Sequence, residues 1–277
     1  MSGFLPVSVL MSLYHAECPL NLDKSMSSLY TQTQLPHEVL LVIDGPIGDK
    51  LELIVTKWKA FLPIKCLYLP ENVGLSSALN IGLNECENEL IARFDTDDVC
   101  FPERFHTQSL FMTNNPTIDI CGGFAKFIDS NGSEYSQRTL PTEHEKIKKL
   151  IWACPMIHPS VMFRKSSILG IGSYSLSAPY RQDDYELWIR AIDSGLIFHN
   201  LPEYLIQYRY NIDDFKKNTF SVGWNRFKIG LKPWFRYDRG GIAFLGLLYP
   251  LIRASLPNII AVKLSTLVRN YDPRVKG

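Results

Sequence analysis

The fold is decided by residues 89–98, Glu89-Leu90-Ile91-Ala92-Arg93-Phe94-Asp95-Thr96-Asp97-Asp98. The run from Glu89 to Phe94 is mostly apolar and predicts a buried strand, and three carboxylates follow it within four positions. Carboxylates so close together repel one another unless a cation lies among them. Oxygen ligands with no neighbouring His or Cys favour Mg²⁺ or Mn²⁺ over zinc. The alternative is a solvated acidic turn that caps the helix expected to begin at Pro102.

Strand and helix patterns alternate around this stretch. The predicted strands are 7–13, 39–43, 64–69 and 89–94, and the predicted helices are 20–32, 51–61, 74–83 and 102–114. Such alternation predicts an α/β fold with a mostly parallel sheet, right-handed crossovers and helices on both faces. Ligands collect beyond the carboxyl ends of parallel strands. His15–Glu17, Asp44 and Asp95–Asp98 follow three of these strands, so we expect them to converge.

The pattern changes after residue 115. Residues 119–139 predict a hairpin or meander with a turn at Asp129-Ser130-Asn131-Gly132. The remaining predicted elements are helices at 143–153 and 183–194 and short strands at 158–163, 197–199 and 204–208.

The composition is that of a folded protein with one large domain or a domain with an appendage. The chain has 277 residues, of which 46% are apolar and 21% charged, which excludes a disordered chain and a collagen-like fibre. Its six cysteines include no C-x-x-C pair, so we expect reduced core thiols and neither a zinc site nor a disulfide framework. The first 20 residues have no signal-peptide pattern, so we expect a protein that stays inside the cell.

Charge is divided unevenly along the chain. From Lys216 onward there are twelve Lys and Arg residues and two acids, whereas residues 1–215 hold 17 basic and 26 acidic residues. Aromatic residues alternate with the first of these basic residues, and an uncharged run of 13 residues follows, from Gly240 to Ile252. We therefore divide the chain into a domain at 1–212 and a basic, aromatic and apolar helical region at 213–277.

The C-terminal region is predicted to lie on an anionic membrane surface at headgroup level, because its apolar run is shorter than the roughly 20 residues that span a bilayer. The alternative is a helical subdomain whose apolar face docks on the rest of the protein. Nucleic acid is not an expected partner, since the apolar run would serve no purpose there.

A second acidic pair lies at the start of the helix predicted at 183–194. Either Asp183 or Asp184 can cap that helix, because carboxylates are favoured beside its free N–H groups. Capping needs only one of the two, which leaves the other free to act as a general base.

Two further signals are weaker. Asn72-Val73-Gly74 precedes a helix with small residues, where backbone N–H groups could approach a diphosphate or a ribose, although a plain glycine turn explains the same spacing. His158 stands before Pro159, and a lone histidine is more often structural than catalytic.

Taken in order, these motifs resemble those of the family 2 glycosyltransferases of the GT-A fold, in particular the bacterial enzymes that assemble O-antigen and capsular or exopolysaccharide repeat units. The resemblance covers about residues 5–210. The matching stretches are 7–14, Gln32 with 36–39, 44–46, 72–80, 91–98, 102–108, 158–164 and 183–188.

The resemblance implies a nucleotide-sugar donor, usually UDP-linked, and a Mn²⁺ or Mg²⁺ cofactor. Asp97 would be the principal metal ligand, with Asp95 near the ribose or the metal. Asp184 would be the catalytic base, with Asp183 beside it. The implied donor-binding residues are Tyr14, Asp44, Asn72, Arg93 and Asp95, with Tyr14 and Asp44 at the uracil, and the implied acceptor-side residues are His158 and Trp188.

Two departures from the family pattern bear on these roles. The family's Glu-Asp pair is Asp183-Asp184 here, so the first acid is shorter by a methylene and either could be the base. The frequent Ala-Arg-Asn of related enzymes is Ala78-Leu79-Asn80 here, so an arginine facing phosphate or base is missing, and Arg93 is a candidate substitute.

The expected reaction transfers a hexose, galactose or glucose, from a UDP-sugar to an undecaprenyl-diphosphate-linked sugar, with inversion at C1. The enzyme is expected in the cytoplasm, peripheral on the inner face of the cell membrane. A pyrophosphorylase-like sugar-nucleotide enzyme is the first alternative, but residues 14–17 are not a Gly-rich phosphate loop. A non-catalytic nucleotide-sugar-binding module is the second, but Asp183 and Asp184 are both present.

Overall fold

A computed structural model describes residues 5–210, 219–256, 260–261, 264 and 272–274. The strands are β1 (Val7–Leu13), β2 (Glu38–Ile43), β3 (Ile64–Tyr68), β4 (Leu90–Arg93), β5 (Val99–Cys100), β6 (Ile120–Ile128), β7 (Glu134–Arg138), β8 (Met162–Arg164) and β9 (Phe198–Arg209). The helices are α1 (Pro19–Tyr30), α2 (Asp49–Lys59), α3 (Leu75–Glu85), α4 (Arg104–Asn114), α5 (His144–Lys149), α6 (Lys165–Gly170), α7 (Asp183–Asp193), α8 (Phe220–Tyr237) and α9 (Gly241–Ala254), with 3₁₀ turns η1 (Ile151–Ala153) and η2 (His158–Ser160).

These strands form one sheet in the order β3-β2-β1-β4-β8-β6-β9-β5, with β7 paired to β6. β3, β2, β1 and β4 are mutually parallel, and β6 and β9 are parallel, while β8 runs antiparallel between β4 and β6. Leu13 at the end of β1 lies opposite Ile43 at the end of β2, so the residues that follow both strands meet at one edge. The predicted mostly parallel sheet is confirmed.

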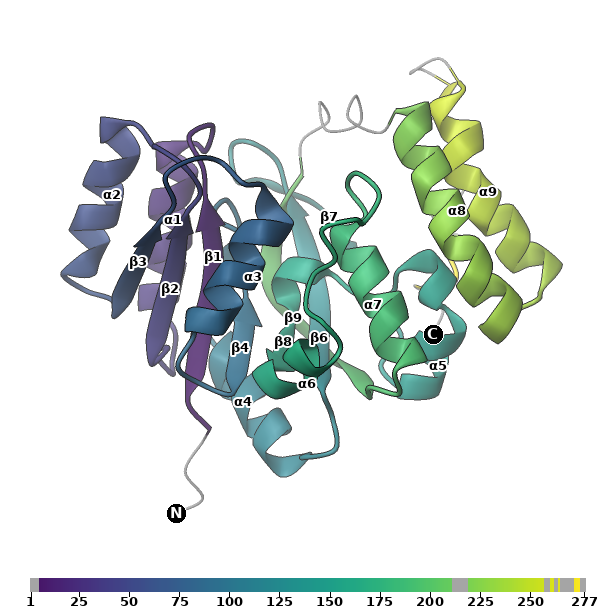
Figure 1. The fold of residues 1–277 in the computed structure, drawn as a ribbon, viewed down its shortest axis with the longest axis horizontal. Coiled ribbons are helices and arrows are strands. Elements are labelled where there is room, and N and C mark those ends of the chain that lie inside the picture. The colour runs from purple at the N-terminus through teal and green to yellow at the C-terminus, as the bar shows by residue number, and fades with distance from the viewer. Residues whose placement is uncertain (1–4, 211–218, 257–259, 262–263, 265–271, 275–277) are drawn as a thin grey trace.

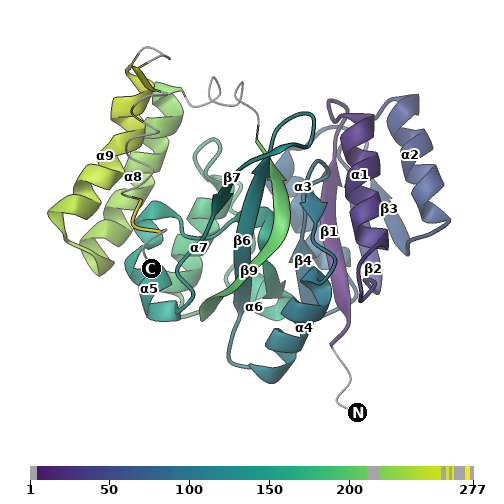
Figure 2. The ribbon, with the colours of Figure 1, turned by 180° about the vertical axis from the view of Figure 1, so that it is seen from behind.

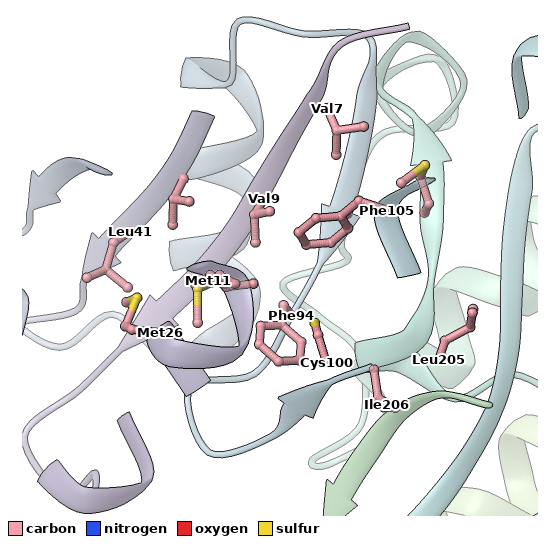
Figure 3. Close-up of a cluster of buried hydrophobic side chains, with 14 of the residues drawn as sticks. Val7, Val9, Met11, Met26, Leu41, Phe94, Cys100, Phe105, Leu205 and Ile206 are labelled. Carbon is pink, nitrogen blue, oxygen red and sulfur yellow. The ribbon is translucent and has the colours of Figure 1, made fainter. Parts of the chain in front are cut away.

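Helices cover both faces of this sheet (Figures 1 and 2). Alternate residues of β1 point to opposite faces. Val9 and Met11 join the core under α1, α2 and α4, whereas Leu10 joins the core under α3 and α7. Figure 3 shows side chains of the first of these cores, among them Met11 of β1, Phe94 and Phe105 of α4.

Some expectations about the second half are wrong. The strand expected at 158–163 begins only at Met162, because Pro159 fixes a helical φ in the first turn of η2. The two strands expected at 197–199 and 204–208 are the single strand β9, which carries Pro202 past β6 through shifts of register. The helix expected at 143–153 ends at Lys149 and is followed by η1.

One expectation about the cysteines is also wrong. All six were expected to be core thiols, but Cys18 is exposed.

The C-terminal helices α8 and α9 lie side by side at the end of the molecule farthest from β3 (Figures 1 and 2). They pack on η1 through Trp152, and a Cβ on Gly230 of α8 would lie 2.7 Å from Tyr185 Oη of α7. Asp193 of α7 forms ion pairs of 2.7 Å with both Lys232 and Arg236 of α8. The C-terminal helices therefore dock on the rest of the protein, while the domain boundary at residue 212 stays a prediction.

Among the helices that the structure describes, none combines the length and the hydropathy that crossing a bilayer requires.

Candidate active site

Asp44, directly after β2, is built into the loop that follows β3. Its carboxylate accepts hydrogen bonds from the N–H groups of Val73 (2.7 Å) and Gly74 (3.2 Å) and from Asn72 Nδ2 (3.1 Å). A Cβ on Gly45, whose φ is +82°, would lie 2.7 Å from the backbone nitrogen of Asn72, so glycine is needed for this close approach. Asp44 occupies the N–H groups of Val73 and Gly74, so these two groups are not free to bind a diphosphate or a ribose while this contact is made, which favours the alternative of a plain glycine turn.

Tyr14 stands at the same edge as Asp44. The N–H of Asp44 donates to the carbonyl of Leu13 (2.7 Å), the residue before Tyr14. The carboxylate of Asp44 is almost fully buried, at 3% exposure, whereas Tyr14 is 44% exposed. An exposed ring next to a fixed hydrogen-bond acceptor is a suitable arrangement for a planar heterocyclic base.

The three carboxylates of Asp95, Asp97 and Asp98 place oxygen atoms within 4.8 Å of one another. Burial raises the pKa of Asp97 to about 7, and the negative charges of Asp95 and Glu17 add to this effect. Burial also raises the pKa of Asp98, whose Oδ1 accepts the N–H of Arg209 (2.7 Å). The other oxygen, Oδ2, is buried with no hydrogen-bond partner among the described residues. A hard divalent cation would satisfy these oxygens, so the cluster fits Mn²⁺ or Mg²⁺.

The loop after β1 meets the loop after β4. Thr96 Oγ1 donates to a carboxylate oxygen of Glu17 (2.8 Å), and Ser25 Oγ donates to the carbonyl of Asp95 (3.3 Å). The expected convergence of residues 15–17, Asp44 and 95–98 at one edge of the sheet is therefore confirmed.

Arg93 is committed to Asp95. Its side chain is 2% exposed and its Nη1 lies 2.5 Å from Asp95 Oδ1. Burial alone would lower the pKa of Arg93, but the charge of Asp95 outweighs burial and raises this pKa above the ordinary value. Arg93 therefore already neutralises one carboxylate of the acidic cluster.

Asp183 and Asp184 begin α7 and have different partners. Asp183 Oδ1 accepts a 2.6 Å hydrogen bond from Ser76 Oγ of α3. Asp184 Oδ1 accepts the N–H of Tyr185 (2.8 Å), and burial raises the pKa of the Asp184 carboxyl. The positive charge of Arg226 opposes this rise without cancelling it. A carboxylate with a raised pKa and no strong ion pair is suited to accept a proton.

Asp184 lines a pocket of about 160 Å³. Arginines dominate its polar lining, which also contains the predicted acceptor-side residue His158. The lining residues are Phe127, Arg138, Cys154, Met156, Ile157, His158, Pro159, Asp184, Tyr208, Arg226 and Arg274.

His158 lies between this pocket and the core. Its Nε2 is 2.7 Å from Tyr174 Oη, and burial with the nearby charge of Arg93 lowers the pKa of His158 well below its ordinary value, so the ring is neutral. Trp188 is fully buried and packs edge-on against His158, with ring centres 5.8 Å apart. Trp188 can therefore act on an acceptor only by positioning His158.

The amide of Asn80 holds the backbone of Tyr174 through two hydrogen bonds of 2.8 Å. This contact gives Asn80 a structural role.

The sequence motifs did not single out Arg138, Arg226 or Arg274, nor assign a role to Asp98. Asp98 is recognisable from the acidic run, whereas the three arginines come from segments with no shared local pattern. β9 contributes to both parts of the site, because Tyr208 lines the pocket of Asp184 and the N–H of the next residue, Arg209, donates to Asp98 Oδ1 (2.7 Å). Burial, together with the charges of the acidic cluster, raises the pKa of Tyr208.

Comparisons with known proteins agree with this geometry. Residues 8–171 match the family described as glycosyl transferase family 2. The amylovoran biosynthesis glycosyltransferase AmsE of Erwinia amylovora is 36% identical over 248 residues, which are 86% of this chain and 91% of that protein. An Escherichia coli protein named UDP-Gal:alpha-D-GlcNAc-diphosphoundecaprenol beta-1,3-galactosyltransferase is 32% identical over 211 residues, 76% of each chain.

Solved structures show the same fold. S. aureus TarS 1–349 in complex with UDP gives a TM-score of 0.62 at 18% identity, over 97% of this chain and 88% of that one. Mannosyltransferase PcManGT from Pyrobaculum calidifontis, in complex with GDP-Man and Mn²⁺, gives 0.63 at 16% identity, over 98% of this chain and 82% of that one. The family match and the bacterial relatives, together with this fold, show that the chain belongs to glycosyl transferase family 2, with the GT-A fold that its motifs predict.

Proposed function

We propose that this glycosyltransferase moves a hexose from a UDP-sugar to a lipid-diphosphate-linked sugar in the assembly of a bacterial surface polysaccharide. The observation that carries the proposal is the placement of two acidic groups. The cluster Asp95–Asp98 follows β4 at the sheet edge that also carries Asp44, and Asp184 lines a pocket to which β9 contributes Tyr208, the neighbour of Arg209, whose N–H donates to Asp98 Oδ1. One group suits a donor with its metal, and the other suits an acceptor hydroxyl.

Asp97 and Asp98, with Asp95, would hold Mn²⁺ or Mg²⁺. A bound cation of this kind neutralises charge that develops on the leaving diphosphate. Asp97 is the principal ligand in this proposal, because Asp95 is already paired with Arg93 and Asp98 with the backbone of Arg209.

Asp44 and Tyr14 bind the uracil of the donor. A carboxylate has about four acceptor positions, and the loop residues 72–74 use three of those on Asp44. The remaining position is free to accept the N–H of the uracil ring. Asn72 acts in this site by holding Asp44, and Arg93 acts by holding Asp95.

Asp184 is the base that removes the proton from the acceptor hydroxyl. The hydroxyl oxygen then attacks C1 of the donor sugar from the face opposite UDP, and this single displacement inverts the anomeric centre. We assign the base to Asp184 because Asp183 is held by Ser76 and does not line the pocket. His158 and Trp188 shape the acceptor side in this proposal.

The nature of the substrates is supported by the named relatives. The Escherichia coli relative carries UDP-Gal and a GlcNAc-diphosphoundecaprenol in its name, and another relative is named O-antigen biosynthesis glycosyltransferase WbnJ. UDP-galactose is therefore the first donor to test and UDP-glucose the second, with an undecaprenyl-diphosphate-linked N-acetylhexosamine as acceptor.

We also propose that α8 and α9 attach the enzyme to the inner face of the cell membrane. α9 packs on the protein through the buried residues Ala243 and Leu247, but its outward face is apolar as well. On that outward face Ile242, Leu245 and Ile252 are 84%, 64% and 49% exposed. A helix that is apolar on its outer face and neighboured by exposed basic residues suits the headgroup layer of an anionic membrane.

The experiment that tests the proposed function is a donor screen with a synthetic lipid-diphosphate N-acetylglucosamine acceptor, with and without Mn²⁺. We expect transfer from UDP-galactose or UDP-glucose that requires the metal, and a product whose anomeric configuration, read by NMR, is inverted. Hydrolysis of the nucleotide sugar with no glycoside product from any donor would contradict the proposal.

A further inference from the structure

Three arginines line the pocket of Asp184, and they come from three parts of the chain. Arg138 ends β7, Arg226 lies within α8, and Arg274 belongs to the described segment 272–274. Arg226 Nη2 and Arg274 Nη1 both donate to the carbonyl of Ala153, at 2.9 and 3.0 Å. Two guanidinium groups that share one carbonyl oxygen lie side by side.

Aromatic rings lie beside two of these three arginines. The guanidinium of Arg138 lies 4.9 Å from the ring centre of Phe127, and that of Arg226 lies 4.9 Å from the ring centre of Tyr185. Such contacts hold a guanidinium in one plane and leave its N–H groups directed along that plane.

The cluster has an excess of positive charge. Arg274 is paired with Asp272 at 2.6 Å, but within the described residues neither Arg138 nor Arg226 has a carboxylate ion-pair partner. Burial and the neighbouring charge of Arg274 lower the pKa of Arg138 to about 10. Buried like charges are costly unless a counter-charge binds among them, so the pocket is suited to an anion.

The position of the pocket indicates which anion it would bind. Its lining contains Asp184 but none of Asp95, Asp97 or Asp98, and neither Asp44 nor Tyr14. In a single displacement the base lies on the acceptor's side of C1, opposite the leaving UDP. An anion held in the same pocket as the base therefore arrives with the acceptor.

We propose that Arg138, Arg226 and Arg274 bind the diphosphate of the acceptor and so present the attached sugar to Asp184. This inference rests on the proposed function. Guanidinium groups pair with phosphate oxygens through two parallel hydrogen bonds, and three of them match a group with several negative charges. Two of the three come from the C-terminal region, so that region completes the acceptor site.

The test compares two acceptors that carry the same sugar, one on a lipid diphosphate and one on a neutral alkyl glycoside. For Arg138→Gln we expect a KM for the diphosphate acceptor raised roughly 10- to 100-fold, because a charge-assisted contact is lost. The KM for the UDP-sugar should stay unchanged, and the kcat/KM for the neutral acceptor should fall far less than that for the diphosphate acceptor. Lys228→Gln, on the same helix as Arg226 but outside this pocket, is the matched control and should behave as the wild type does.

Two results would overturn the inference: an equal loss on both acceptors, or a raised KM for the UDP-sugar with an unchanged KM for the acceptor. A binding measurement separates this inference from the proposed function. Farnesyl diphosphate is titrated into protein saturated with UDP and Mn²⁺, with farnesol as the neutral comparison. Binding of farnesyl diphosphate that the wild type and Lys228→Gln show and Arg138→Gln loses supports the inference even if no sugar is transferred. A wild type that does not bind farnesyl diphosphate overturns it.

Discussion

Asp184 of α7 and Arg226 of α8 line the same pocket, although they lie on opposite sides of the boundary predicted at residue 212. The positive charge of Arg226 counteracts the rise that burial causes in the pKa of Asp184. The C-terminal region therefore influences the carboxyl that we propose as the base, and it takes part in the active site as well as in the proposed membrane contact.

The first prediction concerns the base. Asp184→Asn should leave binding of UDP and Mn²⁺ unchanged and lower kcat by roughly 100- to 10,000-fold, because a positioned general base contributes about that much. Asp183→Asn is the matched variant and should lose far less, since it mainly weakens the hydrogen bond from Ser76. Calorimetric binding of UDP with a radiolabelled transfer assay measures both effects. Full transfer by Asp184→Asn would refute the assignment.

The second prediction concerns pH. The base works when deprotonated, so kcat falls as the pH falls through the pKa of Asp184. Arg226→Gln removes a charge that lowers this pKa, so the acidic limb of the kcat profile should move to higher pH. The pH profile of kcat is measured at saturating acceptor and saturating Mn²⁺. Bound metal then keeps the carboxylates of residues 95–98 deprotonated, and the limb reports the base.

Arg138→Gln serves as the control for this profile. The side-chain charges that act most on the pKa of Asp184 are those of Arg226, Arg93 and Asp183, so Arg138→Gln should move the acidic limb less than Arg226→Gln does. If the acidic limb of the kcat profile lies at the same pH for the wild type and for Arg226→Gln, the coupling between Asp184 and Arg226 is contradicted.

The third prediction concerns the acidic cluster and stability. The pKa of Asp97 is raised in the folded state, so its ionisation opposes folding increasingly as the pH rises from about 4 to about 7. In EDTA at pH 7.5, Asp97→Asn should therefore unfold with a free energy higher by roughly 1–3 kcal/mol. Mn²⁺ should raise the Tm of the wild type and not that of the variant.

The same variant should lose metal-dependent turnover of the donor by about 100-fold or more. Glu87→Gln, an exposed acid away from the cluster, should resemble the wild type in both the thermal and the activity measurements. If Mn²⁺ raises the Tm of Asp97→Asn as much as it raises the Tm of the wild type, the metal does not bind at Asp97.

The fourth prediction concerns the membrane. The double variant Ile242→Ser with Leu245→Ser should weaken binding to anionic vesicles by about tenfold or more, because two exposed apolar side chains no longer enter the headgroup layer. Leu20→Ser, at an exposed position of α1 far from α9, is the control and should float with vesicles as the wild type does. Equal flotation of all three proteins would end the attachment proposal.

The first half of the fold was predictable because three of its strands, β1, β2 and β4, are buried on both faces. Every residue of β2 is buried, and residues 39–43 of this strand form an unbroken apolar run that the local sequence reveals. The convergence of Asp44 with the acidic cluster then follows from parallel topology alone. The second half was harder, because its strands are short or bent. β5 has two residues, and β9 passes Pro202 through a change of register.

The candidate site divides in the same way. The acidic residues lie in short local motifs, Asp95–Asp98 after β4 and Asp183 with Asp184 at the start of α7. The cluster of Arg138, Arg226 and Arg274 depends on tertiary packing of α8 against η1. The local sequence pattern does not predict this packing. Trp188 shows that a motif residue can lie in the core, since the helical spacing of Tyr185, Trp188 and Ile192 turns all three inward.

The most direct test of the central claim is a crystal structure of the protein with Mn²⁺ and UDP. We predict that the anomalous signal of manganese lies among the carboxylates of residues 95–98, with Asp97 as a direct ligand and the uracil against Asp44 and Tyr14. A manganese ion bound to UDP at another place, with Asp97 unligated, would contradict the account.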